Sequence, residues 1–305
     1  MKKFLIVMAI AAAAFFFIQK SIGGQKDSTP VLDTSMLVSE SVVDTSSFAS
    51  MPDEDKSAGK KEDKKQETEK QEQTAVPKGV EIPHGVRPNS QLVRHANFTL
   101  LYNKKTCEPF WVAWQLTNVE TNGDYQRSND FEPDPDISEP YQVISKDYSH
   151  SGYDRGHMAP AADMKFSAQA MTECFYMSNM CPQLHNLNAH SWERVEKACR
   201  RWAKQEGSVY VACGPIFRTK KYNYIGQYHQ IAVPDAFFKV VLSLQKGKEK
   251  AIGFVMNNSN DDQPMKDAAM SVDDVEKLTG FDFFASLPDN LEKRVESNYS
   301  LKAWH

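Results

Sequence analysis

Two stretches of the sequence carry most of its chemistry: Tyr153-Asp154-Arg155-Gly156-His157, and residues 178–200, which read SNMCPQLHNLNAHSWERVEKACR. The first stretch places an acid, a cation, a flexible glycine and a titratable imidazole in direct succession. Such a block suits a bend of the chain that presents His157 to a cleft. A single histidine is more often a hydrogen-bonded structural residue than a catalyst, so the second stretch decides how the first is interpreted.

The second stretch predicts an amphipathic helix from about Leu187 to Gln205, closed by Gly207. Its apolar positions recur at helical intervals, which places one stripe of the helix against a sheet. The stripe consists of Trp192, Val195, Cys199 and Trp202. Asn188 and Glu196 are two steps of four residues apart, and each step drifts by only about 40° on a helix. The two side chains are therefore expected to share a face.

An asparagine and a glutamate on one helix face can serve a hard divalent cation. Mg²⁺ takes oxygen ligands, retains waters and often relies on substrate phosphate for its remaining positions. Without the His157 block, a purely structural explanation is preferred: Asn188 caps the helix, and Glu196 forms an i, i+4 pair with Arg200 worth ~0.2–0.5 kcal/mol. Asp154 could pair with Arg155 or another cation and be structural.

The chain from residue 81 onward alternates strand-like and helical stretches, which indicates a mixed fold. A second helix is expected at Ser271 to Leu278, with acidic residues in its first turn and Gly280 after its end. The expected strands are rich in aromatic and β-branched residues. They are Asn97 to Tyr102, Phe110 to Thr117, Cys174 to Ser178, Ser208 to Cys213, Ala236 to Leu244 and Ala251 to Val255.

The N-terminal part of the chain differs from the rest in composition. Residues 1–20 are expected to be a signal peptide or an N-terminal membrane anchor, because two lysines precede an apolar run from Phe4 to Ile18 that could attach the chain to a membrane. Residues 21–80 are rich in charged and amide side chains and predict a disordered charged linker. The domain that follows is therefore expected to be exported: periplasmic, secreted or membrane-anchored outside the cytoplasm.

Charge and cysteine content limit the remaining interpretations. The formal net charge of −4 gives no support to a basic protein that coats DNA, so an anionic substrate must be held by local positive charge. The five cysteines are an odd number, which leaves at least one thiol unpaired in a monomer. One or two pairs could be oxidised in an exported protein, or several cysteines could be small buried hydrophobes.

Together, the motifs resemble the DNA/RNA non-specific endonuclease family, which includes the endonuclease G-like and Serratia-nuclease-like ββα-metal enzymes. The resemblance rests on the Asp154-Arg155-Gly156-His157 block, on Ser178-Asn179 through Pro182-Gln183, and on Asn188, Trp192 and Glu196 with the family spacing. It covers roughly residues 90–296, so residues 81–305 are expected to form the endonuclease domain. The implied fold is α+β: a mixed, mainly antiparallel sheet with packed helices that carries a ββα-metal motif.

The resemblance also implies a role for each site residue. His157 would be the general base, Asn188 the direct protein ligand of Mg²⁺, for which Mn²⁺ could substitute, and Glu196 would hold metal-bound water. Asn179 and Gln183 would orient the site, with Gln183 also near the substrate. The phosphate would be clamped by Arg127 and Arg155, with Arg200 as a third candidate. Arg127 matches the family arginine that precedes an Asp-Pro segment, here Asp134-Pro135.

The implied activity is metal-dependent hydrolysis of phosphodiester bonds in both DNA and RNA. A site that contacts only phosphates carries no base information, which fits a nuclease without sugar preference. Two other functions stay open: a metal-dependent phosphodiesterase for a smaller substrate, and a nucleic-acid-binding module without catalysis. Loss of His157 or Asn188 would have indicated the module, and both residues are present. A homodimer is also expected from the family.

Overall fold

The structure, a computed structural model, describes residues 76–85 and 87–304. The predicted signal or anchor and most of the predicted linker lie outside these residues. Within the described part of the chain, no helix combines the length and apolar character needed to cross a membrane. Val80, which the sequence assigns to the linker, is fully buried in the core, so the packed domain begins before residue 81.

The centre of the fold is a seven-stranded sheet with the order β1-β2-β3-β6-β9-β10-β11, in which all neighbours are antiparallel. Its strands are β1 (Ser90–Arg94), β2 (Thr99–Asn103), β3 (Glu108–Thr117), β6 (Ser208–Ile216), β9 (Ala236–Ser243), β10 (Lys250–Asn257) and β11 (Ala269–Met270). Two further strand pairs lie outside this sheet: β4 (Asp154–His157) with β5 (Met180–Gln183), and β7 (Asn223–Ile225) with β8 (Ile231–Val233).

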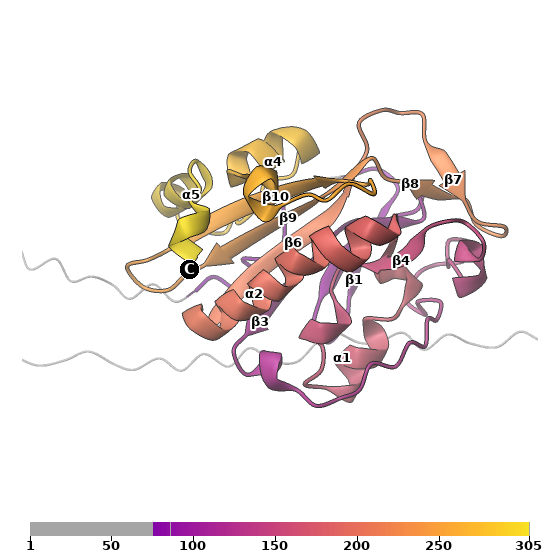
Figure 1. Ribbon diagram of the computed structural model, residues 1–305, viewed down its shortest axis with the longest axis horizontal. Coiled ribbons are helices and arrows are strands. Elements are labelled where there is room, and N and C mark those ends of the chain that lie inside the picture. The colour runs from indigo at the N-terminus through magenta and orange to yellow at the C-terminus, as the bar shows by residue number, and fades with distance from the viewer. Residues whose placement is uncertain (1–75, 86, 305) are drawn as a thin grey trace, which may run out of the picture. The chain divides into compact units, whose positions relative to one another are not determined.

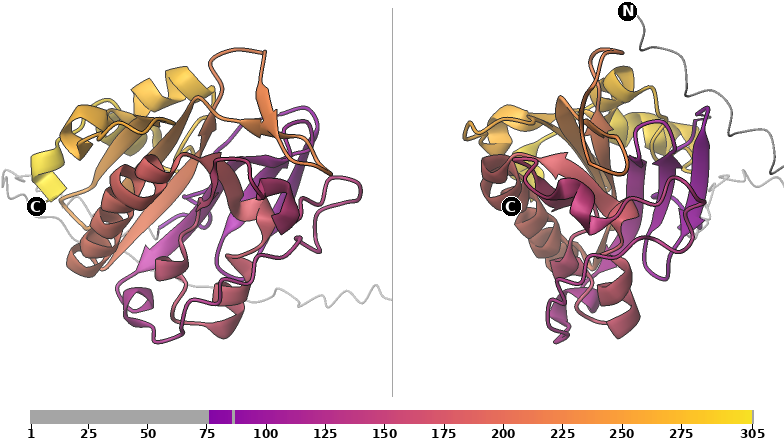
Figure 2. Two further views of the ribbon diagram at one scale, coloured as in Figure 1. Left: turned by 45° about the vertical axis from the view of Figure 1, so that its right-hand side comes forward. Right: turned by 90° about the vertical axis from the view of Figure 1, so that its right-hand side faces the viewer.

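Helices cover both faces of the central sheet (Figures 1 and 2). The α-helices are α1 (Ala168–Glu173), α2 (Glu193–Glu206), α3 (Met265–Ala268), α4 (Val272–Thr279) and α5 (Asp289–Glu296). Short 3₁₀ segments occur at Glu120–Asn122, Ser145–Tyr148, Ala161–Asp163, Met177–Asn179 and Leu301–Trp304, and a π-helical turn, η5, spans Leu187–Trp192. Helix α2 packs on β3 and β6 from one side, whereas α4 and α5 pack on β10 from the other.

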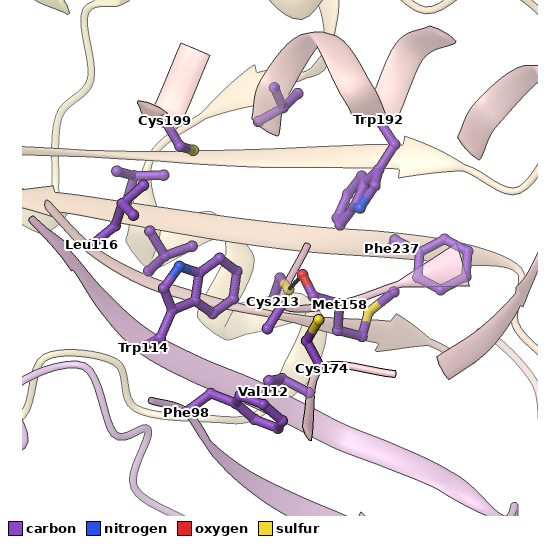
Figure 3. Close-up of a cluster of buried hydrophobic side chains, with 14 of the residues drawn as sticks. Phe98, Val112, Trp114, Leu116, Met158, Cys174, Trp192, Cys199, Cys213 and Phe237 are labelled. Carbon is purple, nitrogen blue, oxygen red and sulfur yellow. Dashed lines mark hydrogen bonds between the residues drawn. The ribbon is translucent and has the colours of Figure 1, made fainter. Parts of the chain in front are cut away.

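The two faces of the sheet bury two separate apolar clusters, because successive side chains of a strand point to opposite sides. On β9, Phe237 and Val241 join the cluster under α2, whereas Phe238 and Val240 join the cluster under α4 and α5. Figure 3 shows part of the first cluster, with Trp114, Trp192 and Phe237 among its labelled side chains. The predicted apolar stripe of the helix lies in this cluster, with every member at most 1% exposed.

The predicted α+β fold with a mainly antiparallel sheet is confirmed, and most predicted elements occur within a few residues of their expected ends. The second predicted helix is α4, which begins after Ser271, whose Oγ accepts a hydrogen bond from the Asp274 backbone N–H at 3.1 Å. It ends at Gly280 with φ of +67°, a conformation that glycine adopts without steric cost.

The strand predicted at Cys174 to Ser178 is wrong. The chain there ends α1 at Cys174 and enters the 3₁₀ segment Met177–Asn179, with a single bridge from Tyr176 to Glu132. Most of these residues are buried by packing around the site rather than by a ladder of strand hydrogen bonds. A short apolar run has no periodicity that distinguishes a strand from a buried irregular segment. The prediction therefore rested on composition alone, and the assignment was wrong.

The five cysteines all lie in the described residues, and all are buried and unpaired. Burial raises the pKa of Cys174, Cys199 and Cys213 to about 12, so these thiols stay protonated. The Cys213 thiol lies 3.3 Å from the backbone oxygen of Met158 and donates to it (Figure 3). The structure therefore favours the alternative in which the cysteines act as small buried hydrophobes.

Candidate active site

His157 lies at the end of β4, and β4 is held by its antiparallel partner β5. The register sets Asp154 opposite Gln183 and His157 opposite Met180, so the two sequence blocks form one unit. Gly156 makes this pairing possible, since a Cβ at that position would lie 2.1 Å from Oε1 of Gln183. The glycine between Arg155 and His157 is thus required by close packing, which the sequence suggested only as flexibility.

Asn179 fixes the chain that follows His157. Its Oδ1 accepts from the Ala159 backbone N–H at 2.9 Å, and its Nδ2 donates to the carbonyls of Ala159 and Cys174 at 2.9 and 2.8 Å. The side chain is completely buried. Asn179 therefore acts through the backbone beside His157 and does not face a substrate.

Gln183 is also completely buried, against Gly156. Its two amide atoms have no hydrogen-bond partner among the described residues. The structure therefore places Gln183 beneath the strand that carries His157.

The His157 ring packs against two aromatic side chains, which also contact each other. Its centroid is 5.8 Å from that of Phe131 and 4.8 Å from that of Phe175. Burial, and then the charge of Arg127, lower the pKa of His157 to about 3. Its Nε2 has no hydrogen-bond partner in the described part of the chain. His157 is thus a neutral imidazole at physiological pH with a nitrogen available to accept a proton.

Arg127 and Arg155 stack on the same two aromatic rings. The Arg127 guanidinium carbon lies 4.9 Å from the Phe175 centroid, and that of Arg155 lies 4.9 Å from the Phe131 centroid. Arg127 is exposed and donates through Nε to Asn129, whereas the buried Nε of Arg155 has no partner among the described residues. Both guanidinium groups therefore lie over rings that contact the imidazole, and such cations suit a site for an anionic group.

Asn188 is joined to β4 through Asp154. Oδ2 of Asp154 accepts from Asn188 Nδ2 at 2.9 Å and lies 2.8 Å from Nδ1 of His185. These contacts use the amide nitrogen of Asn188 and leave its Oδ1 without a hydrogen-bond partner among the residues described. Asp154 does not pair with Arg155. It orients the carbonyl oxygen of the asparagine that the sequence predicts as the metal ligand.

The π-helical turn η5 changes how Asn188 lines up with Glu196. Four residues of an α-helix overshoot a full turn by about 40°. The i→i+5 bonds of a π-helical turn make it wider, so each residue rotates less and the overshoot is offset. Since η5 contains Asn188 and runs directly into α2, the two side chains align more closely than in a continuous α-helix.

Glu196 lies in a group of buried charges under α2. Arg200 donates from Nη1 to Oδ1 of Asp163 at 2.8 Å, and Asp163 also accepts from Nε1 of Trp114 at 3.2 Å. The Lys239 ammonium is fully buried over the Trp192 ring, 4.5 Å from its centroid. Burial raises the pKa of Glu196 to about 7, and the charge of Lys239 opposes that rise.

The structural alternatives for Asn188 and Glu196 do not form. The Asn188 side chain binds Asp154 instead of capping the helix, and Arg200 pairs with Asp163 instead of Glu196. The carboxylate of Glu196 is half-buried and has no hydrogen-bond partner in the described residues. A carbonyl oxygen and a carboxylate are thus left available on this side of α2, which fits a hard divalent cation.

A separate group of possible metal ligands, His95, Asp134 and Asp136, is explained by internal contacts. His95 Nε2 lies 3.0 Å from Oδ2 of Asp134, and the Asp136 backbone N–H donates to Oδ1 of Asp134 at 2.8 Å. Ser178 also donates to Asp134. The group ties the segment that follows Arg127 to the chain before β5.

Several residues of this site were not singled out by the sequence. Phe131, Phe175, Asp163, His185 and Lys239 all contact or influence the predicted residues. Each lies far along the chain from its partner or carries no distinctive spacing. The one available signal was Lys239, a charged residue within the otherwise apolar strand Ala236 to Leu244.

Comparison with known proteins agrees with this geometry. The family model described as "DNA/RNA non-specific endonuclease" matches residues 81–290. This chain belongs to that family.

Individual relatives and a solved structure agree with the family assignment. "Nuclease 1, mitochondrial" of Schizosaccharomyces pombe is 36% identical over 223 residues, which are 67% of this chain and 69% of the relative. "Endonuclease G, mitochondrial" of Bos taurus is 34% identical over 217 residues, 67% of this chain and 72% of the relative. The crystal structure of an EndoG/EndoGI complex superposes with a TM-score of 0.60 at 32% identity, covering 65% of this chain and 86% of that chain.

These relatives make the protein a non-specific nuclease of the EndoG family, an endonuclease among the hydrolases, whose substrate class is nucleic acid. They also correct the expectation of export. That prediction is wrong, because the relatives are named as mitochondrial nucleases. The length and charge of a basic start followed by an apolar run are typical of a membrane-targeting segment. They do not indicate the compartment to which the chain is directed.

Proposed function

We propose that this endonuclease hydrolyses phosphodiester bonds of DNA and RNA with bound Mg²⁺, using His157 as its general base. The observation that carries the proposal is the neutral imidazole of His157, whose Nε2 has no hydrogen-bond partner among the described residues and which lies in the field of Arg127. We assign the activity to residues 81–305. The predicted homodimer stays a prediction.

The chain's own residues supply the proton transfer. Nε2 of His157 accepts a proton from the attacking water as the oxygen–phosphorus bond forms and the bond to the leaving oxygen breaks. General-base catalysis of this kind is typically worth 10²–10⁴-fold. The two phenylalanine rings pack against the imidazole and help to hold its orientation.

Asn188 and Glu196 fit the role of holding the cation. The Asp154 contact leaves Oδ1 of Asn188 free for coordination, and Glu196 offers an unpartnered carboxylate for metal-bound water. A bound Mg²⁺ would stabilise the charge that develops on the phosphate and its leaving oxygen. Mn²⁺ accepts similar oxygen ligands, so it is expected to substitute.

The three arginines have two different proposed roles, which are binding of the substrate and support of the site. Arg127 and Arg155 would clamp the phosphate, since their guanidinium groups lie over the two rings that contact His157. Arg200 is the third candidate, but its pairing with Asp163 favours a supporting role for it under α2. Gln183 and Asn179 would orient β4 and the chain after it. Contacts of this kind read the backbone and not the bases.

The test is cleavage of circular plasmid and of RNA by the full chain, with Mg²⁺ and with a chelator. We expect Mg²⁺-dependent cleavage of both polymers, and a loss of at least about 100-fold in Asn188→Ala. Asn186→Ala, which removes an exposed amide two residues away, is the matched control and should retain activity.

Cleavage that persists in the chelator, or full activity of Asn188→Ala, would overturn the metal assignment. A small chromogenic phosphodiester serves as a further substrate. If it were cleaved while both polymers stayed intact, the smaller-phosphodiester alternative would replace the nuclease.

A further inference from the structure

Three carboxylates meet on the face of the sheet opposite to His157. Asp273 and Glu276 lie on α4, and Glu296 lies on α5. One oxygen of each lies within 4.8 Å of the others. Two oxygens that both bind Ca²⁺ at 2.3–2.6 Å are at most about 5 Å apart, so a single cation can reach all three.

Glu296 provides an independent sign that the group needs a ligand. Its side chain is only 4% exposed, and its Oε1 has no hydrogen-bond partner among the residues that the structure describes. An unpaired buried carboxylate is costly, so such a group must take up a proton or a cation. The Glu276 side chain is also held in position, since its Oε1 accepts a hydrogen bond from the Phe283 backbone N–H at 2.8 Å.

The surroundings of the group add further negative charge. Burial, followed by the charges of Glu276, Glu292, Asp273 and Asp282, raises the pKa of Glu296 to about 9. Burial and neighbouring acids also raise the pKa of Glu276 to about 7.

Two basic side chains of these helices are engaged in other ion pairs. On α4, Lys277 pairs with Asp274, and on α5, Arg294 pairs with Glu249. Across from them, His84 acts on Glu292. The neighbouring charges with the largest effect on Glu296 are all carboxylates.

We propose that Asp273, Glu276 and Glu296 form a second binding site for a hard divalent cation, best suited to Ca²⁺, that joins α4 to α5. Carboxylate oxygens are the ligands such cations prefer, and Ca²⁺ accepts them in flexible geometry, whereas Mg²⁺ demands a near-ideal octahedron. The site lies on the α4 and α5 side of the sheet, whereas η5, which contains Asn188, packs with α2 into the cluster on the other side. Its role is stabilisation of the C-terminal helices.

The first test is the melting temperature of the chelator-treated full chain with Ca²⁺ or Mg²⁺ added. At a Ca²⁺ concentration of 100 times the dissociation constant, Tm should rise by roughly 5–10 °C, and less with Mg²⁺. Glu296→Gln should abolish the rise. Asp274→Asn is the matched control, because it removes an exposed carboxylate from the same helix, and it should keep the rise.

The second test counts the ions by calorimetric titration in the Asn188→Ala background, which disables the proposed catalytic metal ligand. This variant should bind one Ca²⁺ per chain, and adding Asp273→Asn or Glu296→Gln should remove that binding. A Tm that ignores Ca²⁺, or an equal response in wild type and Glu296→Gln, would overturn the proposal. Binding that survives both double variants would overturn it as well.

Discussion

Two groups of carboxylates lie on opposite faces of one sheet, and they differ in how their charge is balanced. Under α2, Asp163 pairs with Arg200, and Glu196 lies in the field of Lys239. Under α4 and α5, the neighbouring charges that most affect Glu296 are those of other carboxylates. The first group is stabilised by the chain itself, whereas the second requires a proton or a metal ion from outside.

The pKa values follow this difference. Glu196 and Glu296 are both raised mainly by burial, but the first reaches about 7 and the second about 9. The cations near Glu196 oppose its rise, and the acids near Glu296 add to it. Burial alone therefore does not decide whether a carboxylate is ionised at pH 7.

Removing Lys239 should have the largest effect on stability. Lys239→Met removes the buried ammonium near Asp163 and Glu196. Removing one member of a buried group of opposite charges should lower the free energy of unfolding by about 3 kcal/mol. Urea denaturation measures the change. Lys250→Met, which removes a partly exposed lysine paired with Glu206, is the control and should lose about 1 kcal/mol or less. Equal losses in the two variants would show that the charge of Lys239 does not stabilise the carboxylates under α2.

The next largest effect is expected from loss of the contact between Asp154 and Asn188. Asp154→Asn keeps the shape but removes the negative charge that orients the asparagine amide, so we expect a 10–100-fold loss in metal affinity or activity. The activity should be measured over a range of Mg²⁺ concentrations. Asp124→Asn changes an exposed aspartate and should behave as wild type. An Mg²⁺ dependence unchanged in Asp154→Asn would show that this contact does not orient the ligand.

The pH profile should separate Glu196 from His157. Glu196 has a raised pKa, so its carboxylate is lost as pH falls through about 7, and kcat/KM, which reports the free enzyme, should fall by about tenfold per pH unit below that. His157, with a pKa of about 3, stays neutral throughout this range. Glu196→Gln should be less active and lack this acidic fall. An identical fall in that variant would assign it to another group.

The smallest expected effect concerns the stability of the α4 and α5 face without metal. Because the pKa of Glu296 is raised above its unfolded value, the folded state binds more protons, and its stability falls as pH rises from about 5 to 9. In chelator, Glu296→Gln should reduce that fall. Thermal unfolding at pH 6 and pH 9 tests this, and an equal fall in both proteins would contradict it.

The sequence predicted the parts of the fold that are locally encoded. Regular strands with β-branched residues and the capped helix α4 could be found because their periods and caps lie within one short window. The segment Cys174 to Ser178 could not, since its apolar residues are buried by distant partners. The π-helical turn at Asn188 leaves no mark in the spacing of four that predicted a plain helix.

The candidate site shows the same division. The motif residues His157, Asn188 and Glu196 were found through their local blocks. The rings beside His157 and the ammonium near Glu196 come from other parts of the chain. Long-range pairing and burial decide these contacts, and neither is encoded in the spacing of residues within a motif.

The measurement that tests the central claim most directly is DNA cleavage by His157→Ala, with DNA binding measured on the same preparations. We expect cleavage to fall by about 10²–10⁴-fold while binding is retained, because His157 moves a proton and Arg127 and Arg155 hold the phosphate. His190→Ala, which changes an exposed histidine of the same domain, should cleave as wild type. Cleavage by His157→Ala at the wild-type rate would contradict the account.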